Sequence, residues 1–213
     1  MAFAKSATAR VAVFLVLVSL LSARSAPAQY VKKLVRSVGV TASVGVVEAT
    51  DSDVETGTTF GLALSLAPSS GWGLAGNLGW FSGDLRLNGT KVARAHVRPL
   101  MLGAGYTWMR GRLSTTAAVT AGISFNSVDL DTPYRDAFGP GERVSLDVDN
   151  SFCVRPSIEV EYALSPKFAV GAWTSYFITS LDSTLTTPPG AVSNHWNPNA
   201  MTAAVGVTVY PFR

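Results

Sequence analysis

The stretch Val38–Val46, with the sequence VGVTASVGV, alternates aliphatic residues with glycine, threonine or serine. Successive side chains of a β-strand point to opposite faces, so this alternation predicts a strand with one bulky apolar face and one small face. The segment Val205–Val209 repeats the pattern near the C-terminal end. No window after Tyr30 has the 3.6-residue period of an amphipathic helix. The sequence therefore predicts an all-β fold.

Eight segments have the alternation or the composition of strands. They are Ser37–Val46, Thr59–Leu66, Trp72–Trp80, Ala93–Trp108, Leu113–Phe125, Phe152–Tyr162, Phe168–Leu181 and Val205–Tyr210. Short Gly-, Pro- or Ser-containing turns alternate with longer polar loops between them. The turns are Ala67–Gly71, Arg110–Arg112 and Ser165–Lys167, and the loops are Ala49–Gly57, Ser82–Lys91, Asn126–Asn150 and Asp182–Asn199. This order is typical of an up-and-down barrel with short periplasmic turns and long extracellular loops.

The chemistry of the two strand faces distinguishes a barrel in lipid from one in water. Charged residues are 15% of the chain, against about 25% in an average soluble domain. A soluble lipocalin-like barrel would carry many charges on its outer face. Here the less apolar face is mostly Gly, Ala, Ser and Thr, which suits the narrow interior of eight strands. We predict a closed, eight-stranded antiparallel transmembrane β-barrel with its aliphatic face outward.

The first residues have the three parts of a secretory signal peptide. Two cations precede the apolar run Val11–Leu21, and Ala26-Pro27-Ala28 resembles a cleavage site. The apolar run has about half the length of a spanning helix, which argues against a membrane anchor. We predict a signal peptide at 1–28 and a barrel domain at 29–213. Removing 1–28 leaves 14 basic and 14 acidic residues, so the mature chain has no net positive charge with which to bind nucleic acid.

Aromatic residues gather near the ends of the predicted strands. Such rings form girdles at the two interfaces of outer-membrane barrels. The predicted girdle includes Trp72, Trp80, Tyr106, Trp108, Phe125 and Tyr162.

The hairpin Glu161–Tyr176 (EYALSPKFAVGAWTSY) resembles those of the small outer-membrane β-barrel family, which includes the transmembrane domain of outer membrane protein A. Val97–Tyr106 (VRPLMLGAGY) resembles another hairpin arm and forms a weak repeat with Val154–Tyr162 (VRPSIEVEY). The resemblance covers roughly Ser37–Phe212. It implies a location in the bacterial outer membrane, contact with its lipids and lipopolysaccharide, and insertion by the barrel-assembly machinery. Members usually end in an aromatic residue, whereas here Phe212 is penultimate before Arg213.

A few charged residues fall on the predicted inner face. Arg155, Glu159 and Glu161 lie on the sixth strand, and Arg98, with His96 and Arg94, on the fourth. Charges inside a membrane-spanning barrel need partners. We predict a lumen network in which Arg98 and Arg155 pair with Glu159 and Glu161. It would act as a structural plug or as the gate of a narrow ion path. The lone Cys153 is expected to be a small side chain inside the barrel.

Signals for catalysis or metal binding are weak. Lipid A deacylases place a serine two residues after their histidine, but the residue two after His195 is Asn197. We therefore expect His195, in the run Ser193–Asn197, to be a loop residue and the chain not to be an enzyme. One cysteine and two distant histidines exclude a usual zinc site, and no cofactor is predicted. The pairs Asp51/Asp53 and Asp129/Asp131 are expected to be solvated loop acids rather than cation ligands.

These observations predict an integral outer-membrane protein with a structural or surface-interaction role. The alternative is a narrow passive channel for ions or small polar solutes, and a lipid-modifying enzyme is the third reading. The loop Asn126–Asn150 is long enough to bind a surface partner, which no motif identifies.

Overall fold

The computed structural model describes residues 38–50, 54–66, 70–87, 90–133, 144–187, 190–196 and 199–211. The signal peptide predicted at 1–28 and the terminal Phe212-Arg213 lie outside the described residues. In this part of the chain the strands are β1 (Gly39–Ala49), β2 (Gly57–Leu66), β3 (Gly71–Leu87), β4 (Thr90–Arg110), β5 (Leu113–Leu130), β6 (Ser145–Val148), β7 (Ser151–Ala163), β8 (Phe168–Thr179), β9 (Leu181–Thr187), β10 (Gly190–Trp196) and β11 (Ala200–Val209).

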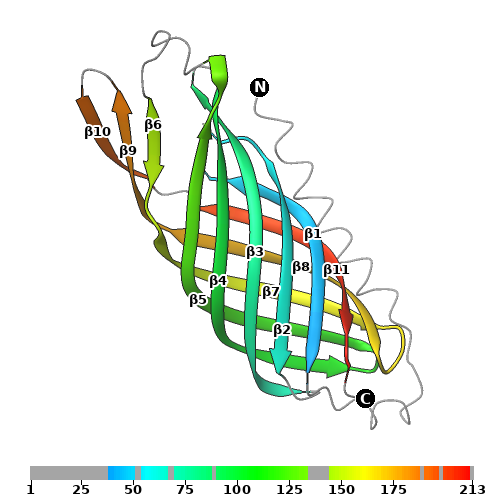
Figure 1. Cartoon of the computed structure of the whole chain (residues 1–213). Coiled ribbons are helices and arrows are strands. Elements are labelled where there is room, and N and C mark those ends of the chain that lie inside the picture. Colours follow the sequence, from blue (N-terminus) through cyan, green and yellow to red (C-terminus); the bar gives the residue numbers. More distant parts are fainter. Residues whose placement is uncertain are drawn as a thin grey trace.

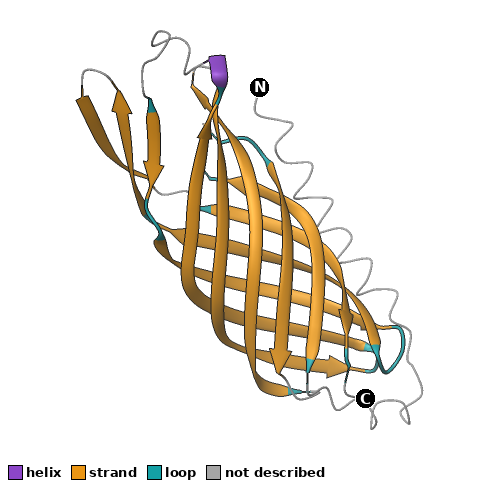
Figure 2. Ribbon diagram, in the orientation of Figure 1, coloured by secondary structure: helices purple, strands orange, loops and turns teal. Residues whose placement is uncertain are grey.

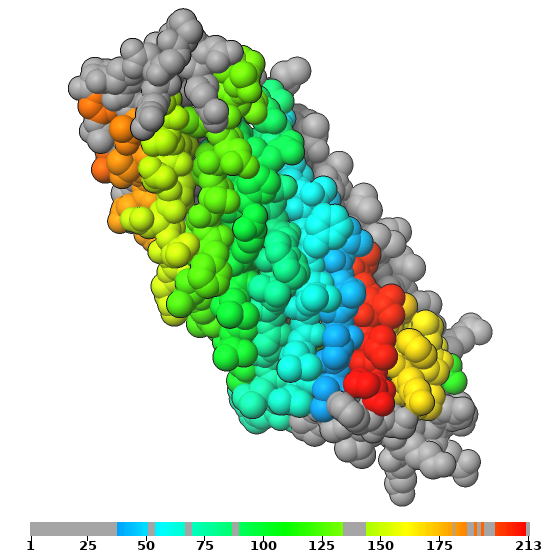
Figure 3. Space-filling model, viewed as in Figure 1, coloured from blue at the N-terminus to red at the C-terminus, as the bar shows by residue number. Residues whose placement is uncertain are grey.

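Eight of these strands form a closed antiparallel barrel in the order β1-β11-β8-β7-β5-β4-β3-β2 (Figures 1 and 2). The first and last strands close it, in a register that runs from Val40↔Val209 to Ala49↔Ala200. In Figure 3 the blue to green strands β1 to β5 lie side by side, with the red β11 next to β1. The predicted eight-stranded barrel is confirmed. Because the sheet closes, its backbone groups find partners without water.

The outer wall of the barrel is apolar, as the alternation of the sequence predicts. On β2, Phe60, Leu62 and Leu64 are exposed, while Gly61 and Ala63 alternate with them on the lumen side. Large exposed hydrophobic side chains continue around the other strands. An outer surface of this kind is unfavourable in water and suits hydrocarbon. Among the described residues, no helix is long and apolar enough to cross a membrane.

The seam between β1 and β11 depends on a residue without a side chain. A Cβ atom added to Gly206 would collide with the carbonyl oxygen of Ala42 and come within 2.8 Å of the Trp173 ring. Glycine therefore allows β1 and β11 to approach closely at the place where the barrel closes.

The strands at the long-loop end are longer and more numerous than the sequence predicted. The stretch Ser82–Lys91 was expected to be a loop, but β3 continues to Leu87 with a register shift between Leu85 and Arg86, and β4 begins at Thr90. The expected loops Asn126–Asn150 and Asp182–Asn199 contain β6, β9 and β10, which form a separate three-stranded sheet (Figure 1). In β9 and β10 polar residues occupy both faces, so no hydrophobic period marks them as strands, and in β6 the alternation of Leu146 and Val148 with polar residues extends over only four residues.

The opposite end has tight turns. Gly111 has φ +66°, a left-handed value that glycine adopts without strain, and it links β4 to β5. In the turn after β7, the backbone amides of Lys167 and Phe168 both donate to Oγ of Ser165. We call this the turn end of the barrel, and we call the end that carries β6, β9 and β10 the loop end.

Candidate functional site

Three charged residues of β7 line the lumen. Arg155, Glu159 and Glu161 have the inward parity of the strand, and all three border a cavity of about 140 Å³. Asn77 of β3 and Trp173 of β8 contribute to the same cavity. Because β7 runs from the loop end to the turn end, Arg155 lies above the two glutamates when the loop end is placed upward.

The carboxylate of Glu161 is held by hydroxyl groups. It is 7% exposed, and its Oε1 accepts a 2.5 Å hydrogen bond from Oγ1 of Thr208. The hydroxyl of Tyr210 donates to Oε2 at 3.1 Å, and Oγ of Ser114 reaches the same oxygen at 3.4 Å. Since Thr208 donates to Glu161, it accepts at 2.8 Å from Thr41. These bonds satisfy a carboxylate that would otherwise be costly to bury.

Removing this carboxylate is expected to destabilise the barrel. The Glu161→Ala variant leaves the hydroxyls of Ser114, Thr208 and Tyr210 without their acceptor, which should lower the free energy of unfolding by about 1–3 kcal/mol. Glu161→Gln keeps one acceptor oxygen and should lose less. Urea unfolding in lipid vesicles measures both values. Equal stability of Glu161→Ala and the native chain would contradict a bonding role for this carboxylate.

Buried polar atoms without a partner also occur around the lumen. Oδ1 of Asn77, Nε of Arg155 and Oγ of Ser175 come from three different strands, and none has a hydrogen-bond partner in the protein. All three residues line the 140 Å³ cavity. Buried atoms of this kind are normally satisfied by water, and a cavity needs only about 10–15 Å³ per water molecule. We therefore expect the turn-end half of the lumen to be hydrated.

An apolar cluster lies inside the barrel on the loop-end side of this cavity. Met101, Cys153 and Phe177 are at most 1% exposed, and Phe81 and Val97 pack against them. The rings of Phe81 and Phe177 meet edge to face, with centroids 5.2 Å apart. We call these five residues the plug. A hydrophobic constriction of this kind can stop ions by excluding water.

The structure does not bring Arg98 and His96 into the lumen. Arg98 is exposed and shares its face of β4 with the exposed Leu100 and Leu102. Nε2 of His96 lies 3.3 Å from Oδ2 of Asp129, on the outer side of the barrel. Of the predicted network, only the three β7 residues therefore share the lumen. Counting back in steps of two from Leu102 leads to Arg98, so the outward parity was readable from the sequence.

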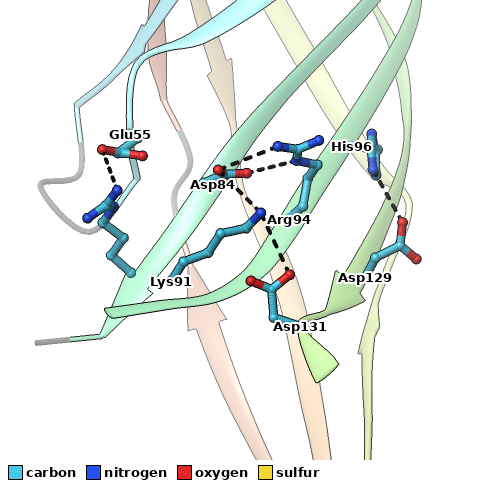
Figure 4. A network of polar contacts seen from close by, with 8 residues as sticks. Glu55, Asp84, Lys91, Arg94, His96, Asp129 and Asp131 are labelled. Atoms are coloured by element: carbon cyan, nitrogen blue, oxygen red, sulfur yellow. Dashed lines mark hydrogen bonds and ion pairs between the residues drawn. The ribbon is translucent and has the colours of Figure 1, made fainter. Parts of the chain in front are cut away.

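Ion pairs join β3, β4 and β5 at the loop end (Figure 4). Nε of Arg94 donates to Oδ1 of Asp84 at 2.8 Å, and Nζ of Lys91 lies between Asp84 at 3.4 Å and Asp131 at 3.7 Å. The hydrogen bond from Arg94 holds the pKa of the Asp84 carboxyl below its usual value. Arg86 pairs with Glu55 at 3.0 Å. These contacts fix the strands where they extend past the apolar wall.

The structure places the six predicted girdle residues on the outer wall. Trp72, Tyr106 and Trp108 are near the turn end, where Tyr106 contacts both tryptophans, with ring centroids 5.5 and 4.7 Å apart. Tyr162 is exposed on β7 near the same end. The exposed Trp80 and Phe125 lie toward the loop end. Two bands of rings are thus separated by the aliphatic part of the wall.

The residues weighed for catalysis or metal binding show no assembled site. Ser193 and His195 belong to β10, whose backbone pairs with β9, and Oγ of Ser193 lies 3.1 Å from Oγ1 of Thr184. The pair Asp51/Asp53 and Asn197 lie outside the described residues. Within the described ranges, no group of three or more His, Cys, Asp or Glu side chains could hold a metal ion.

Comparison with known proteins gives a consistent result. The family model "Outer membrane protein beta-barrel domain" matches residues 13–210. The outer membrane protein OprG from Pseudomonas aeruginosa has a similar structure, with 13% sequence identity, a TM-score of 0.67, and coverage of 83% of this chain and 97% of that one. The outer membrane protein AlkL has 14% identity, a TM-score of 0.53, and coverage of 88% and 93%. Neisserial surface protein A has 13% identity, a TM-score of 0.53, and coverage of 81% and 96%. No curated protein sequence matches this chain.

Proposed function

The chain belongs to the outer membrane protein β-barrel domain family, and from that membership we propose that it acts as a closed barrel with a structural or surface-interaction role. It is a protein of the bacterial outer membrane. In such barrels the short turns face the periplasm and the longer connections face the outside. The loop end with β6, β9 and β10 is then the extracellular end.

The plug is the observation that carries the proposal. Met101, Cys153 and Phe177 are at most 1% exposed, Phe81 and Val97 pack against them while partly buried, and the Phe81 ring meets Phe177 edge to face. Ions would have to cross this apolar layer without hydration. A barrel closed in this way acts through its outer surfaces, so the extracellular sheet is the part that meets a partner. The solved structures described above are outer-membrane or surface proteins, which supports a role without turnover chemistry.

The alternative is a narrow channel for ions or small polar solutes. The cavity of about 140 Å³ and the three unpartnered polar atoms along it favour this reading. A modest movement of the plug would join the cavity to the extracellular end.

Planar bilayer recording separates the two functions. The purified full-length chain is expected to insert without producing discrete current steps. Regular current steps in the native chain would overturn the proposal of a non-conducting barrel and support the channel.

Surface display can be tested on intact cells with a membrane-impermeant maleimide. Ser193→Cys, in the exposed part of β10, should be labelled, whereas Lys167→Cys in a periplasmic turn should not. The native Cys153 is fully buried and should stay unlabelled, so no cysteine needs to be removed. Labelling of Lys167→Cys in place of Ser193→Cys would reverse the orientation and remove the sheet from the cell surface.

A further inference from the structure

Arg98 has an unusual place on the outer wall. Leu100 and Leu102, which follow Arg98 on the outward face of β4 toward the turn end, are 52% and 73% exposed and belong to the aliphatic band. Arg98 is the next outward residue toward the extracellular end, and it is exposed. A cation at the edge of hydrocarbon extends its long side chain toward the headgroups and takes its counter-ion there.

Arg98 has two aromatic side chains beside it on the neighbouring strands and two serines one outward position closer to the extracellular end. The strand register places Phe125 opposite Arg98 on β5, and the pairs Leu78↔Leu100 and Phe81↔Val97 place Trp80 beside it on β3. Both aromatic side chains are exposed. One outward step higher, Ser82 and Ser127 lie on either side of His96. We call the six residues Trp80, Ser82, His96, Arg98, Phe125 and Ser127 the Arg98 patch.

The other cations nearby already have carboxylate partners. Arg94 and Lys91 pair with Asp84, and His96 lies against Asp129. Among the described residues, none of the ion pairs includes Arg98. The cations farther from the hydrocarbon are thus paired with carboxylates of the protein. Arg98, which lies nearest the hydrocarbon, is available to an anion from outside the protein.

We propose that the Arg98 patch binds a phosphate group of lipid A, the membrane anchor of lipopolysaccharide, in the outer leaflet. The guanidinium of Arg98 would form paired charge-assisted hydrogen bonds with phosphate oxygens. Ser82 and Ser127 supply hydroxyl donors on the headgroup side, and Trp80 and Phe125 pack against the adjoining apolar part of the lipid. This inference is independent of whether the lumen conducts.

The test is native mass spectrometry of the full-length chain released from detergent micelles that contain lipid A. The native chain should retain one lipid A molecule, and Arg98→Gln should weaken the apparent affinity roughly tenfold, as expected for a lost hydrogen-bonded charge. Arg98→Lys should fall between them, because it keeps the charge without the planar fork. Arg110→Gln is the matched control, since Arg110 is exposed at the periplasmic end of the same strand and should leave retention unchanged.

Two comparisons make the result decisive. Lipid A without its phosphates should bind to the native chain as weakly as intact lipid A binds to Arg98→Gln. Heat-dependent gel mobility confirms that each variant is folded. Equal retention by Arg98→Gln and the native chain would overturn the proposal, as would equal retention of dephosphorylated lipid A. Equally strong retention of phosphatidylglycerol would overturn the assignment to lipid A.

Discussion

Replacing both Phe81 and Phe177 by alanine is expected to convert a silent barrel into one that conducts ions in discrete steps. The two rings meet edge to face in the plug, and Phe177 is 1% exposed. Their removal should open the apolar layer between the cavity of about 140 Å³ and the extracellular end. Water can then occupy the whole lumen, and the barrier from dewetting is lost.

Single-channel recording in planar bilayers measures this change. The matched control is the pair Phe60→Ala and Phe152→Ala, which removes two phenyl rings from the outer wall, where these side chains are 56% and 67% exposed. It should remain silent. Alanine in place of a buried phenylalanine can cost about 3–5 kcal/mol, so the single variant Phe177→Ala and a heat-mobility assay accompany the double variant. A folded double variant that passes no current would show that the plug is not the barrier.

Cys153 gives an internal check on the same result. Its side chain is fully buried in the plug, so a small cationic thiol reagent should not react with it in the native chain. In the double alanine variant the reagent should reach Cys153 and reduce the current. Adding Cys153→Ala should abolish that block.

The barrel was predictable from sequence because alternate residues of each spanning strand face lipid and the lumen. These two environments favour different side chains, so the sequence has a period of two residues. Val40, Val44, Val205 and Val207 carry the signal directly, since lipid favours bulky aliphatic residues on one face and a narrow lumen favours small residues on the other. The extracellular strands β9 and β10 have no such constraint. The backbones of β9 and β10 pair with each other, and neither face of the pair has to meet lipid. Their sequences therefore show no hydrophobic period.

The candidate site was predictable only in part. The inward parity of Arg155, Glu159 and Glu161 follows from the alternation of β7. The hydroxyl partners of Glu161 do not, because Thr208 of β11 and Tyr210, which follows that strand, lie 47 and 49 residues further along the chain. The plug likewise joins Phe81, Met101 and Phe177 from three strands. Contacts across a lumen depend on the shear of the closed barrel, which the period of a single strand does not specify.

Replacing Leu102 by arginine should be strongly destabilising, although the side chain is among the most exposed in the structure, at 73%. Leu102 lies on the outward face of β4, between Trp108 at the periplasmic girdle and Arg98 at the extracellular edge. A charge placed near the middle of the bilayer on the lipid face costs about 2–4 kcal/mol, falling to about 0–1 kcal/mol at the interface. Thr58→Arg, at an exposed position near the extracellular end of β2, is therefore the control and should cost little. Chemical unfolding in lipid vesicles gives both values. If Leu102→Arg were as stable as Thr58→Arg, the wall would face water, and the membrane-spanning arrangement on which the plug, the girdles and the Arg98 patch depend would be wrong.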